Sequence, residues 1–362
     1  MKPKIGIDEI QPYQGGKPIE EVQRELGVDN VIKLASNENP LGPSPLAVDS
    51  MKKALSDINL YPDGNTYYLK QDLAIHLGVS PENLILGNGS NEVLQIVGDT
   101  FISPNDEVIF SESAFVVYQL VSKICIAKLI IVPMLGFDQD LEAMAGAITD
   151  RTKVAFIANP NNPTGTMVTK NQVERFIEQV PDKVLIVFDE AYYEYINRLD
   201  YPQTINYMNE KENIIITRTF SKIYGLAGLR IGYGISDPKI IDLMNRVRQP
   251  FNCNTLAQVA AHAALKDHQH VQKSQELNKR GKIQLYRFFD EIGLDYVPSE
   301  GNFILVHFDT SGQEIADQLL QKGVIIRPVA GYGFPNSIRV TIGTSEENRR
   351  FISALKEILQ PA

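Results

Sequence analysis

Six short, mainly apolar runs separated by helix-length segments constrain the fold of this chain more than any other feature of its sequence. The runs are 84–86, 107–110, 128–132, 153–157, 184–188 and 213–217. Their apolar residues are continuous rather than alternating with polar ones, which is typical of strands covered on both faces. The intervening segments are long enough for crossover helices. The sequence therefore predicts an α/β fold with a mostly parallel central sheet sandwiched by helices.

The pattern changes on either side of this region, which suggests a division of the chain into three parts. Glycine and proline punctuate residues 1–45, so we expect an irregular N-terminal arm and the start of a small domain there. Residues 46–245 would form the large domain. Residues 246–362 would form a linking helix and a small C-terminal α/β domain, with strand-like runs at 302–307, 323–326 and 337–342. A length of 362 residues suits about two domains.

Residues 237 to about 292 are expected to be mostly helical, and two helix starts are marked by their capping residues. Thr169 and Gln172 have the spacing of a capping box, in which each side chain bonds to the other residue's backbone. Ser345, followed by two glutamates, indicates the start of a terminal helix.

Charge and cysteine content limit the class of function. The formal net charge is −9, so we expect no nucleic-acid-binding surface. Cys125 and Cys253 are the only cysteines, which excludes a disulfide framework and a CxxC metal site and fits a reducing compartment. No metal is expected.

The sequence also shows no sign of export or of membrane insertion. The first residues lack the apolar segment of a secretory signal. The most hydrophobic stretch, 121–137, is interrupted by two lysines and a proline, which leaves no stretch able to span a bilayer. A cytoplasmic protein without membrane contact is expected.

Four loops beside the predicted strands concentrate glycine, amide, hydroxyl and charged residues: 87–92, 159–165, 189–193 and 217–234. Ligands of parallel sheets bind at the carboxyl ends of the strands, so these loops should converge. In the first loop, Gly87 and Gly89 allow close backbone approach. Ser90 and Asn91 can begin a helix whose free N–H groups suit a phosphate. An ordinary capped helix after a glycine turn would explain this loop as well.

Each of the other three loops has a chemical and a purely structural interpretation. Two Asn–Pro steps in 159–165 predict a rigid turn whose amide side chains point outward, or simply a turn. Asp189 follows an apolar strand, so it should be partly desolvated and need a cation or proton donor; it could instead cap the next helix. Lys222 lies among small and apolar residues, which lowers the pKa of a lysine and suits it to covalent chemistry with a carbonyl. Most lysines, however, are solvated surface residues.

Taken in order, these residues resemble the fold-type I pyridoxal-phosphate (PLP) aminotransferases, and among them the histidinol-phosphate aminotransferases. The resemblance runs through 36–42, 61–63, 87–90, 159–165, 189–192, 219–222 and 339–343. It implies that the large domain binds PLP and that the protein is a homodimer with shared active sites.

The resemblance also implies a role for each matching residue. Lys222 would bind the cofactor covalently and move the proton, while Asp189 would keep the pyridine nitrogen protonated. Tyr192 and Asn162 would hydrogen-bond the phenolic oxygen. Phe115 would stack on the ring, where a tyrosine is more common in the family. The phosphate would be bound by Ser90, Asn91, Thr219, Ser221 and Arg230, and by Tyr61 from the partner subunit.

The substrate residues follow from the same resemblance. Arg339 would clamp the carboxylate of glutamate or 2-oxoglutarate, because a guanidinium forms two parallel hydrogen bonds with a carboxylate. L-histidinol phosphate has no such carboxylate, so its phosphate would meet Arg339, or Arg327 and Tyr13 as helpers. Asn37 is also expected to contact substrate.

The implied reaction is a ping-pong transamination in L-histidine biosynthesis. L-Histidinol phosphate and 2-oxoglutarate would give imidazole acetol phosphate and glutamate. Three other functions remain open: an aromatic-amino-acid aminotransferase, a threonine-phosphate decarboxylase, and a regulator without catalysis. The absence of a basic DNA-binding extension argues against the last.

Overall fold

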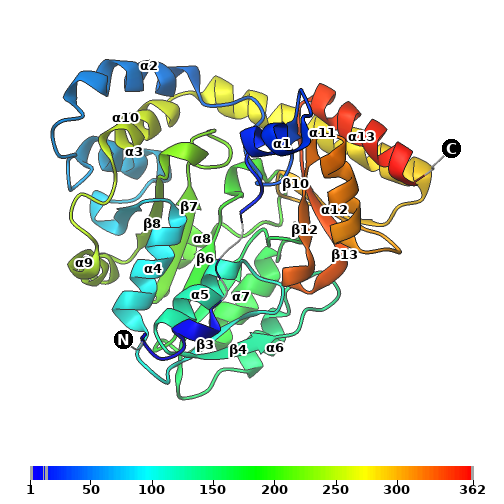
Figure 1. Cartoon of the computed structure of the whole chain (residues 1–362). Coiled ribbons are helices and arrows are strands. Elements are labelled where there is room, and N and C mark those ends of the chain that lie inside the picture. Colours follow the sequence, from blue (N-terminus) through cyan, green and yellow to red (C-terminus); the bar gives the residue numbers. More distant parts are fainter. Residues whose placement is uncertain (1–2, 11, 13–14, 360–362) are drawn as a thin grey trace.

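The computed structural model describes residues 3–10, 12 and 15–359 and places the predicted strands in one large sheet (Figure 1). The strand order is β2-β8-β7-β6-β5-β3-β4. Strands β3 to β7 are mutually parallel, whereas β8 runs antiparallel to both of its neighbours. The bounds are β2 (Leu84–Gly87), β3 (Glu107–Ser111), β4 (Lys128–Val132), β5 (Thr152–Ala158), β6 (Leu185–Asp189), β7 (Ile214–Thr219) and β8 (Gly232–Ser236). The predicted α/β class with a mostly parallel sheet is confirmed.

Helices cover both faces of this sheet, which explains why its strands are continuously apolar. Leu185 and Val187 of β6 belong to a core formed with α4, α5 and α9. Ile186 and Phe188, which point the other way, belong to a core formed with α2, α3, α6, α7 and α10. The helices are α2 (Pro45–Ala54), α3 (Tyr67–Leu77), α4 (Ser90–Phe101), α5 (Val116–Ile124), α6 (Leu141–Gly146), α7 (Lys170–Gln179), α8 (Thr204–Tyr207), α9 (Pro238–Val247) and α10 (Thr255–Ala264).

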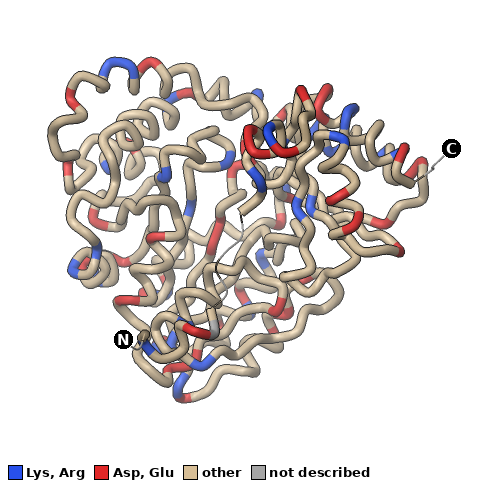
Figure 2. The backbone as a smooth tube through the Cα atoms, viewed as in Figure 1, with Lys and Arg blue, Asp and Glu red and all other residues tan. Residues whose placement is uncertain are grey.

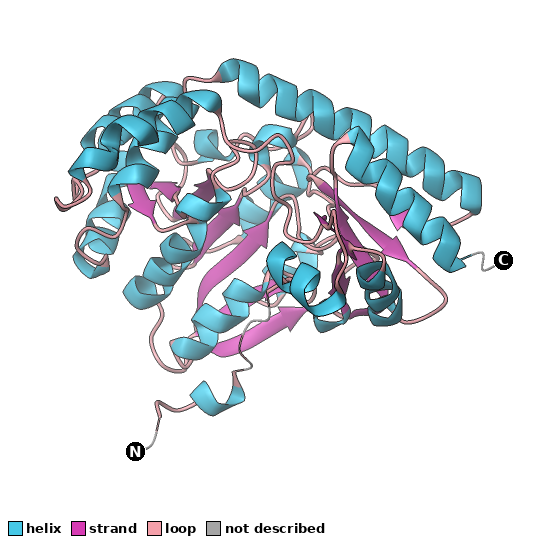
Figure 3. Ribbon diagram, turned by 45° about the horizontal axis from the view of Figure 1, so that its top comes forward, coloured by secondary structure: helices cyan, strands magenta, loops and turns pink. Residues whose placement is uncertain are grey.

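A smaller antiparallel sheet, of order β12-β13-β10-β9, lies beside the large one. Long helix α11 spans from the large sheet to the small one and lies next to α13 over the latter (Figure 3). A separate pair, β1 and β11, joins the N-terminal segment to this part of the chain. The bounds are β1 (Ile32–Lys33), β9 (Tyr296–Val297), β10 (Phe303–His307), β11 (Val324–Ile325), β12 (Arg327–Val329), β13 (Phe334–Thr341), α11 (His268–Ile292), α12 (Gly312–Gln321) and α13 (Ser345–Leu359).

The structure departs from the sequence-based expectation at β8, within the N-terminal arm and at the start of the terminal helix. The apolar-run criterion misses β8, because its sequence Gly-Tyr-Gly-Ile-Ser is not a continuous apolar run although every residue is buried. The arm is not wholly irregular, because α1 (Ile19–Leu26) begins after Pro18 and ends at Gly27 in the left-handed conformation. The terminal helix is capped one residue earlier than predicted.

At that helix the reciprocal capping bonds join Thr344 and Glu347. Glu347 N donates to Thr344 Oγ1 at 3.2 Å, and Thr344 N donates to Glu347 Oε2 at 2.7 Å. Ser345 is therefore the first helical residue rather than the cap. The predicted capping box of Thr169 and Gln172 is present in α7.

Charged residues of both signs are interspersed along the chain (Figure 2). Within the described part of the chain, no helix has both the length and the apolar character needed to cross a membrane. The proposed division at residues 45 and 245 stays a prediction.

Candidate active site

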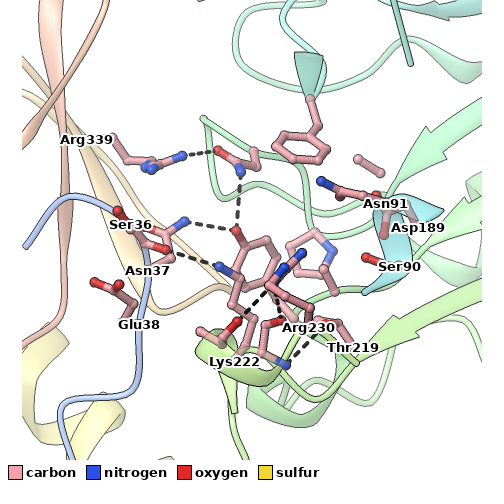
Figure 4. Close-up of a pocket in the computed structure, with 18 of the residues that line it drawn as sticks. Ser36, Asn37, Glu38, Ser90, Asn91, Asp189, Thr219, Lys222, Arg230 and Arg339 are labelled. Carbon is pink, nitrogen blue, oxygen red and sulfur yellow. Dashed lines mark hydrogen bonds between the residues drawn. The ribbon is translucent and has the colours of Figure 1, made fainter. Parts of the chain in front are cut away.

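Residues from both sheets line a cavity of about 380 Å³ at the carboxyl ends of the parallel strands (Figure 4). All four loops singled out in the sequence contribute to it, so their predicted convergence is confirmed. The predicted site residues that line the cavity are Asn37, Ser90, Asn91, Phe115, Asn162, Asp189, Tyr192, Thr219, Ser221, Lys222, Arg230 and Arg339.

One end of the cavity is built to hold an anion. Helix α4 begins at Ser90, so its free N–H groups and the positive end of its dipole face the cavity. The guanidinium of Arg230 reaches the same place and donates to Ser221 Oγ at 3.3 Å and to Ala227 O at 3.0 Å. Thr219 Oγ1 accepts from Ser221 N at 3.1 Å and so fixes this turn. Backbone amides, hydroxyls and a guanidinium together form a donor set suited to phosphate.

Two glycines make this end compact. A Cβ on Gly89, whose φ is 83°, would lie 2.6 Å from Arg230 Nη2. A Cβ on Gly232 of β8 would lie 2.4 Å from Ser90 N. Any larger residue would therefore push the guanidinium or β8 away from the start of α4. The cradle depends on glycine at both positions.

Asp189 lies at another part of the cavity wall and is almost fully buried. Tyr118 donates to its Oδ2 at 2.8 Å, and Thr217 donates to its Oδ1 at 3.0 Å. Burial raises the pKa of Asp189 above its usual value, although the two hydrogen bonds oppose the rise. The carboxylate is not a helix cap, because Tyr192, not Asp189, occupies the N-cap position of the short 3₁₀ helix that follows. A cation in the cavity, such as a protonated ring nitrogen, would stabilise the charged form.

Neither Tyr118 nor Thr217 was among the predicted site residues, although both have a signal in the sequence. Tyr118 follows Phe115, the N-cap residue of α5, by three residues, and the two rings are in contact at the start of the helix. Thr217 pairs with Asp189 in the register of the parallel strands β7 and β6. Each could be inferred only once Asp189 was placed at the end of its strand.

On the cavity wall opposite Asp189, four side chains are connected by a network of hydrogen bonds. Tyr192 Oη accepts from Asn37 Nδ2 at 2.9 Å and from Asn162 Nδ2 at 3.2 Å. Arg339 Nη1 donates to Asn162 Oδ1 at 2.5 Å, and its Nη2 donates to Ala35 O at 2.7 Å. These bonds fix the orientation of the Tyr192 ring and of the Arg339 guanidinium.

The expectation that the 159–165 turn points its amides outward is wrong for two of its asparagines. Asn159 is buried and exchanges two hydrogen bonds with the backbone of Val168. Asn161 is also buried and donates to Ser113 O at 3.1 Å. These two amides thus bond to backbone atoms outside the turn and hold it in place, whereas Asn162 faces the cavity.

Lys222 extends into the cavity, where its Nζ donates to Ser36 O at 3.1 Å. Burial lowers the pKa of Lys222 to about 8, and the positive charges of Arg339 and Arg230 contribute to the decrease. The carboxylates of Glu38 and Asp189 oppose it. The direction of this shift agrees with the one expected from the apolar sequence context.

Two of the predicted residues that the structure describes do not line the cavity of this chain. Arg327 on β12 lies directly opposite Arg339 in the antiparallel ladder, so the two side chains leave the same face of the sheet. Tyr61 is 83% exposed and stacks on Phe251, with ring centroids 4.8 Å apart. Tyr13 lies outside the described residues.

Known proteins similar to this chain match it over nearly its whole length. The family model described as aminotransferase class I and II matches residues 29–355. A histidinol-phosphate aminotransferase of Moorella thermoacetica is 54% identical over 99% of this chain and 93% of its own. Histidinol-phosphate aminotransferase 1 of Nitrosococcus oceani is 51% identical over 98% of this chain and 96% of its own. The structure of histidinol-phosphate aminotransferase from Sinorhizobium meliloti with pyridoxal-5'-phosphate has a TM-score of 0.90 and 28% identity, covering 99% of this chain and 98% of that one.

Proposed function

This chain belongs to the aminotransferase class I and II family, and from that premise we propose that it transfers an amino group between L-histidinol phosphate and 2-oxoglutarate. The products are imidazole acetol phosphate and glutamate, which places the reaction in L-histidine biosynthesis. The observation that carries the proposal is a single cavity that contains the anion-binding start of α4, buried Asp189, Lys222 and Arg339. The identity of about half to relatives named for this substrate supports it.

The cofactor of the family is PLP. When bound, it supplies an aldehyde that links covalently to an amine and a ring that takes up electrons as the donor loses its α-proton. The donor set at α4 fits the phosphate, with Ser90, Asn91, Thr219, Ser221 and Arg230 as its ligands. Asp189 fits the ring nitrogen, because burial of its carboxylate demands a proton donor or a cation.

Tyr192 and Phe115 complete this half of the site. Two amides donate to Tyr192 Oη, so its own hydroxyl proton is available for an acceptor in the cavity, such as the phenolic oxygen of the cofactor. Asn162 provides a second amide hydrogen to the same acceptor. Phe115 is the N-cap residue of α5 at the cavity wall and contributes an apolar face for the ring.

Lys222 is the proposed covalent attachment point and proton carrier. With a pKa of about 8, a measurable fraction of this amine is neutral near pH 7 and can act as nucleophile or base. An ordinary lysine, with a pKa near 10.4, would be almost fully protonated at that pH.

For the substrate we assign Arg339 as the common anion ligand, with Arg327, Tyr13 and Asn37 as helpers. A guanidinium can bind either the carboxylate of 2-oxoglutarate or the phosphate of L-histidinol phosphate in the same forked geometry. Because Arg327 shares the sheet face of Arg339, a second positive charge lies on the same side of the small sheet as the common anion ligand.

We also propose a cytoplasmic homodimer in which Tyr61 reaches the phosphate bound by the partner. Its support is the apolar surface that includes Ile58, Leu60, Tyr61, Tyr67 and Tyr68, each more than half exposed. Cys125 and Cys253 are free and buried, as suits a reducing compartment.

Mixing inactive Tyr61→Ala and Lys222→Ala subunits should restore partial activity, because one site of each hybrid carries neither substitution. Absence of recovery after demonstrated subunit exchange would place Tyr61 within its own chain.

A substrate panel tests the proposed reaction. We expect glutamate to form from L-histidinol phosphate and 2-oxoglutarate. Efficient reaction with phenylalanine or tyrosine and none with L-histidinol phosphate would identify an aromatic-amino-acid aminotransferase instead. Release of CO2 from phosphothreonine would identify a decarboxylase, and PLP binding without any turnover would indicate a regulator.

A further inference from the structure

Among the described residues that line the cavity, Asp189 and Glu38 carry carboxylates, and the proposed function uses only Asp189. Glu38 lies in the segment 36–42, whose neighbouring Asn37 has an assigned contact with Tyr192. A second carboxylate in a site that binds a dianionic cofactor and anionic substrates repels both. We therefore expect the Glu38 carboxylate to interact with a positively charged group nearby.

The position of Glu38 is fixed relative to Lys222 by hydrogen bonds on both sides of it. Before Glu38, the Ser36 carbonyl accepts from Lys222 Nζ at 3.1 Å. After it, Asn39 Nδ2 donates to Ile223 O at 2.7 Å. The backbone that carries Glu38 is thus attached twice to the backbone and side chain around Lys222, on the same side of the cavity (Figure 4).

The carboxylate of Glu38 is held in turn by Lys33. Lys33 Nζ donates to Glu38 Oε1 at 2.9 Å, and Lys33 belongs to β1, which pairs with β11. The ion pair is only partly exposed, with side-chain exposures of 22% and 43%. Glu38 thus has Lys33 as its direct partner, and it lines the same cavity as Lys222.

Lys222 is otherwise surrounded by an excess of positive charge. Arg339 on β13 and Arg230 near β8 both disfavour its protonated form, and Glu38 and Asp189 favour it. In the proposed reaction Asp189 already has a cationic partner, the protonated ring nitrogen. Glu38 is then the carboxylate that remains for the lysine.

We propose that Glu38 is a positioning residue for Lys222, whose carboxylate, tethered by Lys33, holds the Lys222 ammonium on the Ser36 side of the cavity. The inference rests on the proposed function, because it concerns the steps in which Lys222 carries the proton taken from the amino donor. In those steps the ammonium must stay within reach of the substrate, and the carboxylate of Glu38 attracts it toward the Ser36 side of the cavity.

The test follows the titration of Lys222 in the full-length protein after removal of PLP. Acetic anhydride labels neutral amines, so the labelling rate of the Lys222 peptide against pH, read by mass spectrometry, gives the midpoint. Glu38→Gln should lower this midpoint by about half a unit, because the charge removed is partly screened by solvent. At pH 7 the labelling rate of Lys222 would then rise about 2.5-fold, given a starting pKa of about 8.

A second substitution should shift the titration midpoint of Lys222 in the opposite direction. Lys33→Met removes a positive charge and leaves Glu38 to act on Lys222 alone, so the midpoint should rise. Glu25→Gln is the matched control, since Glu25 forms a comparable ion pair with Lys17 at 2.6 Å, with 45% and 44% side-chain exposure, and does not line the cavity. It changes the net charge by the same amount and should leave the midpoint unchanged.

An unchanged midpoint in Glu38→Gln would overturn the proposal. So would a decrease in both Glu38→Gln and Lys33→Met, which would indicate displacement of the loop, or an equal decrease in Glu25→Gln, which would indicate a general charge effect. Failure of the proposed function has a different signature. In that case borohydride would attach PLP to a lysine other than Lys222, whatever the effect of Glu38.

Discussion

Arg339 donates a hydrogen bond to the amide oxygen of Asn162, 2.5 Å away, and Asn162 in turn donates to the hydroxyl of Tyr192 at 3.2 Å. Arg339 belongs to the small antiparallel sheet, whereas Asn162 and Tyr192 lie in loops that follow β5 and β6 of the large sheet. The residue proposed to bind substrate is thus connected to two residues proposed to bind the cofactor. Substitution of Arg339 should therefore affect every substrate.

Arg339→Ala is expected to slow the half-reactions with both glutamate and L-histidinol phosphate. Each loses a charge-assisted pair worth roughly 1.5 to 3 kcal/mol, or about tenfold to a hundredfold in rate. Arg339→Lys should recover little, because an ammonium lacks the forked geometry. Single-turnover absorbance of the bound cofactor measures each half-reaction separately.

Arg327→Ala should slow the half-reaction with L-histidinol phosphate alone. An equal loss of rate with glutamate would exclude Arg327 as a dedicated phosphate ligand.

Asp189→Asn should retain the cofactor but lose most of its turnover. An amide in this buried position cannot stabilise a protonated ring nitrogen, although it still fills the space and accepts a hydrogen bond from Tyr118. We expect a decrease of at least about a hundredfold in kcat, on the scale of a lost buried charge interaction. Cofactor content by absorbance and turnover by glutamate formation give the two readouts. Near-normal turnover would exclude Asp189 from the mechanism.

Gly89→Ala should weaken cofactor binding, because the new methyl group would lie 2.6 Å from Arg230 Nη2 and displace the guanidinium. Gly136→Ala is the matched control. Its φ of 65° imposes a similar backbone cost, yet nothing lies within 4 Å of the added Cβ. We expect at least about a tenfold increase in the Kd of PLP for Gly89→Ala alone, since a charge-assisted hydrogen bond is lost. Equal effects in both variants would attribute the loss to backbone strain.

The depressed pKa of Lys222 predicts a pH-dependent cost in stability. Its pKa is about 8 in the folded protein and near 10.4 when unfolded. Between these pH values the unfolded chain binds more protons than the folded protein does. The free energy of unfolding therefore rises with pH from about 8 to 10, as the cost of burying this lysine disappears. Without PLP, Lys222→Met should therefore be more stable than wild type at pH 7, by on the order of 1 to 3 kcal/mol, and this difference should shrink by pH 10. Urea unfolding at the two pH values measures it, and a constant difference would contradict the assignment.

The sequence predicts the strands and loops of the large sheet well, because strands buried on both faces leave continuous apolar runs. It predicts less well where a side chain's role depends on a partner far along the chain. The contact of Tyr118 with Asp189 spans 71 residues, and that of Lys222 with Ser36 spans 186. Strand β8 is missed because close packing against the start of α4 requires glycine in place of apolar side chains.

The family resemblance identifies the expected cofactor-binding residues. The placement of Arg327 and Tyr61, however, depends on geometry that the sequence does not specify. Arg327 is adjacent to Arg339 only because β12 pairs with β13 in that register. Tyr61 is exposed to solvent and does not line the cavity of its own chain. Both assignments stay predictions.

The central claim is that Lys222 is the amine that binds PLP, and chemical mapping tests it most directly. Borohydride reduction of the PLP-loaded protein, followed by proteolysis and mass spectrometry, identifies the modified lysine. A suitable internal comparison is Lys282. Burial also lowers the pKa of Lys282 to about 8, but this residue donates to Ser299 O and does not line the cavity. After borohydride reduction we predict that the cofactor is covalently attached to Lys222 and not to Lys282. In Lys222→Ala this attachment should be lost. Cofactor attached to Lys282 or to any other lysine in the wild-type protein would contradict the account.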